Sequence, residues 1–455
     1  MFTQRIVRVT YLTGAALAAY LCLAINIAIS QAEDPLSPDV LRALALKSTN
    51  SLKTVQVSDA PTFKQFVADR AALQQLGKAL FWDQKVGSDN QSCASCHFHA
   101  GADNRSKNQI NPGFRNTLVF GGDNSFGASA RGQLRPNYQL TIDDFPFHKL
   151  QDPNNQNSAV LADTNDVVSS QGAFAALFKG LDSMSNDIGT PMTTGVFRDG
   201  SAMVRNVEPR NTPTVINAVL NHRNFWDGRG RNEFNGVNPL GSLDPGKIVK
   251  VPSANQIVFV QTRISDSSGA SQAAGPPLSD LEMSFAGRTF ALLGRKLLSP
   301  SVKPLAAQTV DRTDSVLGVI SAGVGLNTSY VELIKKAFDT KWWDAPAGWV
   351  VDISNVNDPK LLQLPKGIQP NMATQFTVME YNFGLFMGMA VNEYEKLLIA
   401  NDSPFDRFME GNNSALNTSQ QQGLRIFLTT GKCVNCHGGH PRPELGGQSC
   451  RRRRL

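Results

Sequence analysis

Two short motifs in the chain combine residues that can hold a prosthetic group covalently. In each, two cysteines are separated by two residues and followed directly by a histidine. The residues are Cys93, Cys96 and His97 in the first motif and Cys433, Cys436 and His437 in the second. This spacing is the attachment signature of a c-type haem. The thiols add to the vinyl groups of the porphyrin, and the histidine then ligates the iron.

Zinc binding and disulfide formation are the alternatives for these four cysteines. A four-cysteine zinc site would leave the histidine after each pair unexplained. Paired cysteines in an exported protein form disulfides by default, but the C-x-x-C-H spacing argues against that here. Because the chain has only six cysteines and six histidines, the repeated motif indicates two covalently bound haems c.

The elements that must position the motifs are predicted helices. Residues 73–81 place apolar side chains at helical spacing before the first motif. That segment contains a Gly-x-x-x-Phe element, and residues 422–427 repeat this element before the second motif. Thr418 or Ser419 is the expected N-cap of the second helix. An amphipathic helix precedes the haem in the cytochrome c module. The sequence therefore predicts a mainly α fold with two cytochrome c-like haem domains.

The N-terminus has the pattern of an export signal. Residues 1–32 combine Arg5 and Arg8 with an apolar stretch from Leu12 to Ile29 and a small-x-small cleavage site. An uncleaved membrane anchor is the alternative. The net charge of +6 equals the charge of these two arginines and of the four arginines at 451–454. The rest of the chain therefore has no net charge. We therefore expect a periplasmic protein without a nucleic-acid partner.

From about Leu76 to His437, six segments resemble the bacterial diheme cytochrome c peroxidases, the family that includes the MauG-type enzymes. The segments follow the family's order and are Leu76–Phe81, Ser92–His97, Arg210–Thr214, Phe225–Arg229, Gln272 with Glu282 and Met283, and Ser403–Arg407. The resemblance implies an enzyme that reduces hydrogen peroxide to water. Its electrons would come from a small redox protein, a cytochrome c or a copper protein, and a homodimer is one oligomeric state it allows.

The resemblance also assigns roles to the haem ligands and to the residues around them. His97 would ligate the iron that reacts with peroxide, and His437 the iron that receives electrons. Trp226 corresponds to a tryptophan that relays electrons between the haems, although it could equally be a core aromatic. Asn211 corresponds to an asparagine that helps to bind calcium between the domains, although a turn residue before Pro213 is the alternative.

Two polar residues are implied to do the proton chemistry. Glu282 corresponds to the family's distal glutamate, and breaking the O–O bond of peroxide requires a proton to move from one oxygen to the other. A carboxyl group whose pKa is raised by burial can accept and return that proton. Gln272 would orient the peroxide or a water molecule. Two exposed polar residues in the loop 271–284 are the alternative.

The expected organisation is a signal peptide (1–32), a leader or linker (33–60), an N-terminal peroxidatic haem domain (61–300) and a C-terminal electron-transfer domain (311–455). An insertion between His97 and Asn211 is expected to form long loops over the first haem, and a second insertion separates Trp226 from Gln272. They favour a MauG-like oxidase of a protein or organic substrate as an alternative function. A diheme electron carrier without peroxidase activity is another.

Two ligand positions depart from the family pattern. The distal ligand of the first haem could be Met203, His148, His222 or none, and the sequence does not decide among them. After His437 too few residues follow to supply the sixth ligand of the second haem. We expect that the second domain is incomplete, either truncated or frameshifted near the terminal arginine run.

Overall fold

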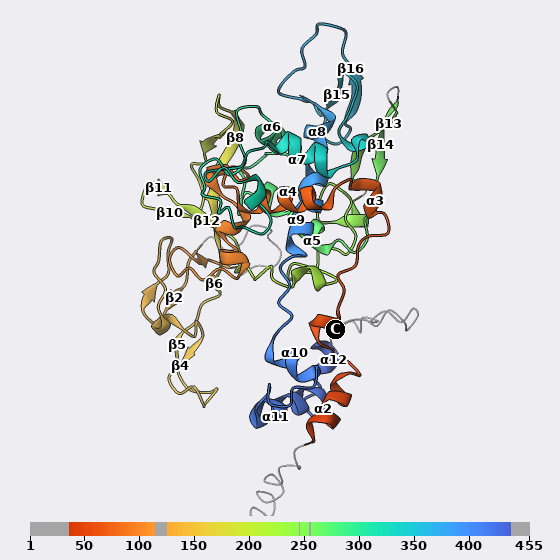
Figure 1. The fold of residues 1–455 in the computed structure, drawn as a ribbon. Coiled ribbons are helices and arrows are strands. Elements are labelled where there is room, and N and C mark those ends of the chain that lie inside the picture. The colour runs from red at the N-terminus through yellow and green to blue at the C-terminus, as the bar shows by residue number, and fades with distance from the viewer. Residues whose placement is uncertain (1–35, 114–124, 245, 254–255, 438–455) are drawn as a thin grey trace, which may run out of the picture. The chain divides into compact units, whose positions relative to one another are not determined.

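The computed structural model describes residues 36–113, 125–244, 246–253 and 256–437. It divides them into two compact units (Figure 1). The larger unit holds residues 57–399, and the smaller one combines 36–56 with 400–437. The predicted signal peptide and the terminal arginine run lie outside the described residues. No helix within the described ranges is long and apolar enough to cross a bilayer.

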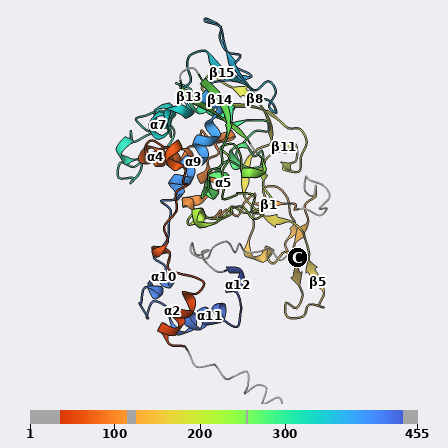
Figure 2. The ribbon, with the colours of Figure 1, turned by 90° about the vertical axis from the view of Figure 1, so that its right-hand side faces the viewer.

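The larger unit is built around two long helices that cross closely, as Figure 2 shows. Helix α4 (Arg70–Trp82) contains the apolar segment predicted to be helical and is capped by Asp69. Helix α9 (Phe383–Glu395) is buried along its whole length. A Cβ atom at Gly77 would lie 1.9 Å from the carbonyl oxygen of Ala390. Only glycine therefore permits the crossing at this point.

Further helices complete this apolar core. They are α3 (Phe63–Phe66), α5 (Ser268–Ala273), α6 (Phe290–Leu297), α7 (Tyr330–Ala337) and α8 (Val378–Tyr381). Helix α5 packs on α9, α6 on α8 and α9, and α7 on α4. Met387 and Met389 of α9 are both buried in this core. The core of the larger unit is thus helical, as the sequence predicts.

Two further segments of this unit are interrupted rather than continuous helices. Residues 376–398 form α8 and α9 with a break at Asn382, whose side chain bonds to the backbone of Val249 and to the carbonyl oxygen of Trp342. Residues 311–338 contain only a short 3₁₀ turn and α7. Gly323 and Gly325 interrupt this segment, because their φ angles of +83° and +69° belong to the left-handed region.

The expected domain boundary between residues 300 and 311 does not coincide with the division in the structure. Helix α7 packs against α4, and the backbone N–H of Ala68 donates to Ala337 at 2.9 Å. These contacts bind residues 311–399 into the larger unit. That each unit carries one haem stays a prediction.

The long insertion after His97 forms antiparallel strand pairs rather than the expected loops. In Figure 1 its strands lie to one side of the helical core of the larger unit. The pairs are β1 (Ile110–Asn111) with β6 (Val167–Val168), β2 (Ala128–Ser129) with β3 (Gly132–Gln133), β4 (Lys149–Leu150) with β5 (Val160–Ala162), β7 (Gln171–Phe174) with β12 (Arg205–Val207), β8 (Ala176–Leu181) with β9 (Asp187–Pro191), and β10 (Arg198–Asp199) with β11 (Ala202–Met203).

Two more small sheets lie later in the larger unit. The second insertion forms the hairpin β13 (Lys247–Ser253) and β14 (Gln256–Gln261), and a three-stranded sheet has the order β16 (Lys360–Gln363), β15 (Trp349–Asp352), β17 (Gln375–Phe376). The mainly α expectation therefore describes the core of this unit and not its insertions.

The smaller unit joins the two ends of the described chain. It contains α2 (Pro38–Ala45), α10 (Pro404–Met409), α11 (Thr418–Leu428) and α12 (Val434–His437). Leu41 of α2 packs with Phe408 and Leu416 in a small core, so part of the expected leader 33–60 is a packed helix. The cap of α11 is Asn417, whose side chain accepts from Gln420, rather than Thr418 or Ser419.

Candidate haem and proton-transfer site

The first haem motif lies on a tight turn that follows helix α4. The 3₁₀ turn η3 (Cys93–Ser95) is closed by a capping box between Ser92 and Ser95. Cys93 packs against the apolar core, and both thiols of the motif are free. Burial raises the pKa of Cys93 and of Cys96 to about 12, which keeps both thiols neutral. Two adjacent free thiols on one turn fit the attachment of a haem c.

The ring of His97 is held by a hydrogen bond to another segment of the family resemblance. Its Nδ1 lies 2.7 Å from the carbonyl oxygen of Pro213, in the Arg-Asn-Thr-Pro-Thr segment. A carbonyl oxygen only accepts, so Nδ1 carries the proton and the lone pair is on Nε2. Burial lowers the pKa of His97 to about 4, so the ring is neutral. A neutral imidazole held by a second hydrogen bond is the form that ligates a metal.

Glu282 forms a hydrogen-bonded pair with a second carboxyl group, that of Glu208. Burial raises the pKa of Glu208 far above its ordinary value, and the charge of Glu282 raises it further. Burial also raises the pKa of Glu282. The pair lies near the haem motif, because the charge of Glu282 acts on the Cys93 thiol and that of Glu208 on the Cys96 thiol. The sequence analysis missed Glu208, whose only signal was its place shortly before Arg210.

The segments that carry Glu208 and Glu282 both bond to the backbone of strand β7 or of Ser170, the residue before it. The backbone N–H of Glu208 donates to Ser170 at 3.0 Å, and the N–H of Ala173 donates to the carbonyl oxygen of Glu282 at 2.9 Å. Gly172 lies between these bonds, and a Cβ there would be 2.4 Å from that same Glu282 oxygen. The insertion therefore supplies the strand against which the backbone of Glu282 is fixed.

A buried arginine anchors the loop that carries Glu282. Arg288 donates through Nη2 to the carbonyl oxygen of Pro277 at 2.7 Å and through Nη1 to that of Val86 at 3.0 Å. Its guanidinium also pairs with Asp187 at 2.7 Å, and Lys296 pairs with the same carboxylate at 3.0 Å. Such a buried, multiply bonded group restricts the loop from residue 277 to residue 288.

Other polar atoms in this region have no hydrogen-bond partner among the described residues. The Oε1 atom of Gln272, on α5, is buried in this way, as is Oε2 of Glu395 at the end of α9. Burial raises the pKa of Glu395 to about 8, and its charge acts on Cys93. Unpartnered buried polar atoms are the kind that a bound group can satisfy.

Trp226 lies on the surface of the larger unit rather than in its core. Its side chain is 84% exposed, and the guanidinium of Arg210 lies 5.1 Å from its ring centroid. Asp227 and Arg229 form an ion pair at 2.9 Å, and about 40% of each side chain is exposed. The relay role of Trp226 stays a prediction.

The structure does not choose a distal ligand. His148 pairs with Asp163 at 3.2 Å beside the β4–β5 hairpin, Met203 pairs with Arg198 in the β10–β11 ladder, and His222 is exposed. Asn211 is exposed as well. No cluster of three His, Cys, Asp or Glu side chains suited to a metal occurs in the described ranges. Calcium binding at Asn211 therefore stays a prediction.

The second haem motif lies at the end of the smaller unit. Cys433 and Cys436 are free and exposed, and His437 ends α12. Helix α11 precedes the motif, as predicted, and its Leu424 and Leu428 pack on the small core. The two thiols and the histidine are the correct donor set for a haem c.

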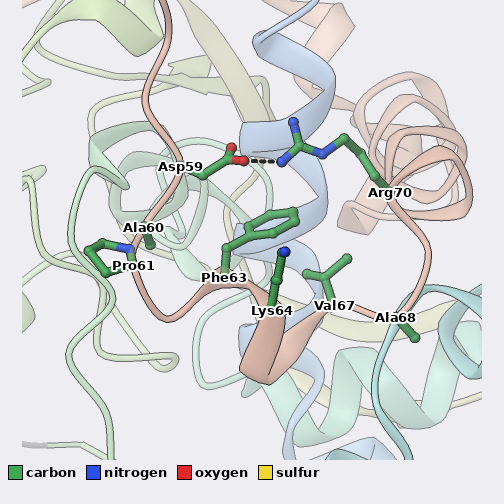
Figure 3. A pocket seen from close by; sticks show the side chains of 8 residues that line it. All are labelled: Asp59, Ala60, Pro61, Phe63, Lys64, Val67, Ala68 and Arg70. Atoms are coloured by element: carbon green, nitrogen blue, oxygen red, sulfur yellow. Dashed lines mark hydrogen bonds and ion pairs between the residues drawn. The ribbon is translucent and has the colours of Figure 1, made fainter.

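The described part of the chain also has a surface pocket of about 350 Å³ that is unrelated to these motifs (Figure 3). Asp59 and Arg70 form an ion pair across it, and Lys396 adds a second cation to Asp59. Neither cysteine nor histidine lines this pocket.

The chain matches a protein family whose model is described as di-haem cytochrome c peroxidase, over residues 71–358. It is 26% identical to the cytochrome c551 peroxidase of Pseudomonas aeruginosa over 241 residues, which cover 53% of this chain and 39% of that protein. It is 24% identical to the cytochrome c peroxidase Ccp of Escherichia coli over 243 residues, covering 53% of this chain and 29% of that protein.

A shorter region is 36% identical to the cytochrome-c peroxidase IdrP2 of Denitromonas iodatirespirans, over 86 residues, 19% of this chain and 23% of that protein. The chain thus spans well under two thirds of the length of each of these relatives. The family model covers more than half of the chain, and it includes the first haem motif, His97, Gln272 and Glu282. The chain therefore belongs to the di-haem cytochrome c peroxidase family.

Proposed function

We propose that the protein is an exported, periplasmic diheme c-type peroxidase that reduces hydrogen peroxide to two waters. The reaction takes two electrons, delivered by a small cytochrome c or copper protein, and two protons. The observation that carries the proposal is the half-buried Glu282, hydrogen-bonded to Glu208, next to a haem motif whose His97 is held by the carbonyl oxygen of Pro213. A bound haem c supplies redox chemistry that no side chain has.

The chain's own residues supply ligation and proton transfer. Cys93, Cys96 and His97 would hold the first haem. The Glu282 carboxylate accepts the proton from one peroxide oxygen and returns it to the other, which then leaves as water. Gln272 is suited to orient the peroxide, because the oxygen of its side chain has no partner among the described residues.

In this proposal the haem at the second motif receives the electrons. Cys433, Cys436 and His437 would hold the haem that receives electrons, and Trp226 would relay them to the first haem. The exposure of Trp226 supports a role at a surface, and Asn211 would contribute to a calcium site. A homodimer remains part of the proposal.

The test is a substitution of the proton-transfer residue. Glu282→Gln keeps the size and polarity of the side chain but cannot carry the proton. Peroxide consumption with a reduced small cytochrome should fall about 10²- to 10⁴-fold, while the haem content is unchanged. Glu410→Gln, which alters an exposed carboxylate in the smaller unit, is the control. Full activity in Glu282→Gln would contradict the assignment.

A MauG-like oxidase is the second candidate. The contact of the insertion with Glu282 favours it, since strand β7 helps to shape the surroundings of the proton-transfer residue. This function predicts slow peroxide turnover together with oxidation of a protein or organic target.

A further inference from the structure

We propose that Glu208 and Glu282 form a proton-sharing pair, in which Glu208 holds a proton that keeps Glu282 ionised and ready to act as a base. Glu208 is thereby a positioning residue that acts through Glu282. The catalytic consequence rests on the proposed peroxidase function, whereas the pair itself does not.

The hydrogen bond between the two side chains requires a proton. Two carboxylates only accept, so one of the pair must be protonated for the bond to form. Thr212 Oγ1 donates to Oε1 of Glu208 at 3.1 Å. That oxygen is therefore engaged as an acceptor, and the other oxygen of Glu208 is left to carry the proton toward Glu282.

The surrounding charges assign the proton to Glu208. Arg229 acts on Glu282 and favours its ionised form, and a hydrogen bond from Ser279 acts in the same direction. Asp103 acts on Glu208 and opposes its ionisation. Asp280 opposes ionisation of Glu282, but it is exposed and comes after these two favourable contributions in size. Glu282 therefore has a cationic neighbour, whereas Glu208 has an anionic one.

The backbone fixes the two residues at this separation. Both segments bond to strand β7 or to the residue before it, and Asn206 donates to the carbonyl oxygen of Asp280 at 2.9 Å. Strand β12 is thus tied directly to the loop that carries Glu282. Three hydrogen bonds, those of Glu208, Ala173 and Asn206, thus hold the two segments together, so the carboxyl groups cannot move apart when both ionise. The shared proton is therefore retained at pH values well above the ordinary carboxyl pKa.

The proton on Glu208 is not consumed in this scheme. Glu282 takes the proton from the peroxide and returns it, while Glu208 keeps its own and continues to donate to Glu282. Loss of the Glu208 proton at alkaline pH would place two negative charges side by side and remove the hydrogen bond. Peroxide turnover should therefore fall on the alkaline side of neutrality, as the pair titrates.

The key variant is Glu208→Gln, whose amide still donates to Glu282 but cannot titrate. The first readout needs no peroxide: an infrared pH titration of the carboxylic acid band in the purified haem protein. It is done in a Glu395→Gln background, because Glu395 is a second buried acid with a pKa of about 8. We expect a band that persists at neutral pH, disappears on alkalinisation and is absent from Glu208→Gln.

The second readout is the pH profile of peroxide consumption. Glu208→Gln should lose the alkaline fall and keep the acid limb. Asp280→Asn is the matched control, since it removes a nearby charge without touching the pair, and it should keep both limbs. Thr212→Val provides a second test: losing the hydroxyl that stabilises ionised Glu208 should move the alkaline transition to higher pH.

The outcomes are distinguishable. A wild-type protein with the titrating band but without peroxide turnover would contradict the proposed function and leave the pair standing. A band that remains in Glu208→Gln, or an alkaline limb that Glu208→Gln and Thr212→Val both leave unmoved, would overturn the pair.

Discussion

A buried carboxyl group without a partner destabilises the fold whenever it ionises, and Glu395 is such a group. Its Oε2 atom has no hydrogen-bond partner within the described residues, and burial raises its pKa from 4.5 to about 8. Between these values the folded protein binds a proton that the unfolded chain does not. The contribution of Glu395 to stability therefore decreases as the pH rises through this window.

Glu395→Gln should remove this pH dependence. Near pH 5 the variant and the wild type should have similar free energies of unfolding, because the wild-type side chain is neutral there. Near pH 8 the variant should be more stable by about 2 kcal/mol or more, given a limit of about 1.4 kcal/mol per pH unit. Guanidinium unfolding of the haem protein at both pH values measures this. An equal difference at both would show that Glu395 is ionised in the folded state.

Single residues differ in how far the sequence could reveal them. The haem motifs are local, so Cys93, Cys96 and His97 could be assigned from spacing alone. The Pro213 contact and the Glu208 pairing join residues that are far apart in the chain. Nothing in the local pattern distinguishes Glu208 from an exposed glutamate, because its raised pKa results from burial and from a neighbour 74 positions away.

Strand β7 determines where Glu282 lies, and Gly172 permits its close approach. A Cβ atom at this position would lie 2.0 Å from the carbonyl oxygen of Leu281. Because the contact is with backbone, the loop must move. Gly172→Ala should therefore lower peroxide turnover by at least about tenfold while haem content is kept, as expected when a proton-transfer group is displaced.

The control for this substitution is Gly423→Ala. Gly423 lies on the exposed side of α11, where an added Cβ meets no atom within 4 Å. Alanine there should leave turnover unchanged and stabilise the helix by up to about 1 kcal/mol. Steady-state turnover and the pyridine haemochrome spectrum are the measurements. Unchanged turnover in Gly172→Ala would mean that the strand does not position Glu282.

At the level of elements, periodicity predicted helices better than it predicted their ends. The apolar spacing before each haem motif corresponds to α4 and α11. The break at Asn382 depends on a side chain that bonds to a strand of another segment. The short strands of the insertion are two to six residues long, and two of their pairs, β1 with β6 and β7 with β12, join segments far apart in the chain. Such strands carry too little alternation to be recognised alone.

At the scale of the molecule, the chain's two haem motifs fall in different compact units. The expected boundary near residue 300 was drawn from the order of motifs, which does not show that residues 311–399 pack against α4. The smaller unit is instead completed by α2 from the N-terminal side. Contacts between sequence-distant segments decide such a division.

This division leads to a prediction about haem stoichiometry. Each motif has its own free thiols, and the structure places Cys433 and Cys436 in a unit with a separate small core. The double substitution Cys433→Ala, Cys436→Ala should therefore remove one covalent haem and leave the other attached at Cys93 and Cys96. Intact-mass spectrometry of the exported protein should show two haems in the wild type and one in the variant.

The reciprocal variant, Cys93→Ala with Cys96→Ala, should lose the haem of the larger unit and all peroxide turnover. Loss of both haems from either variant would mean that the two attachments depend on each other.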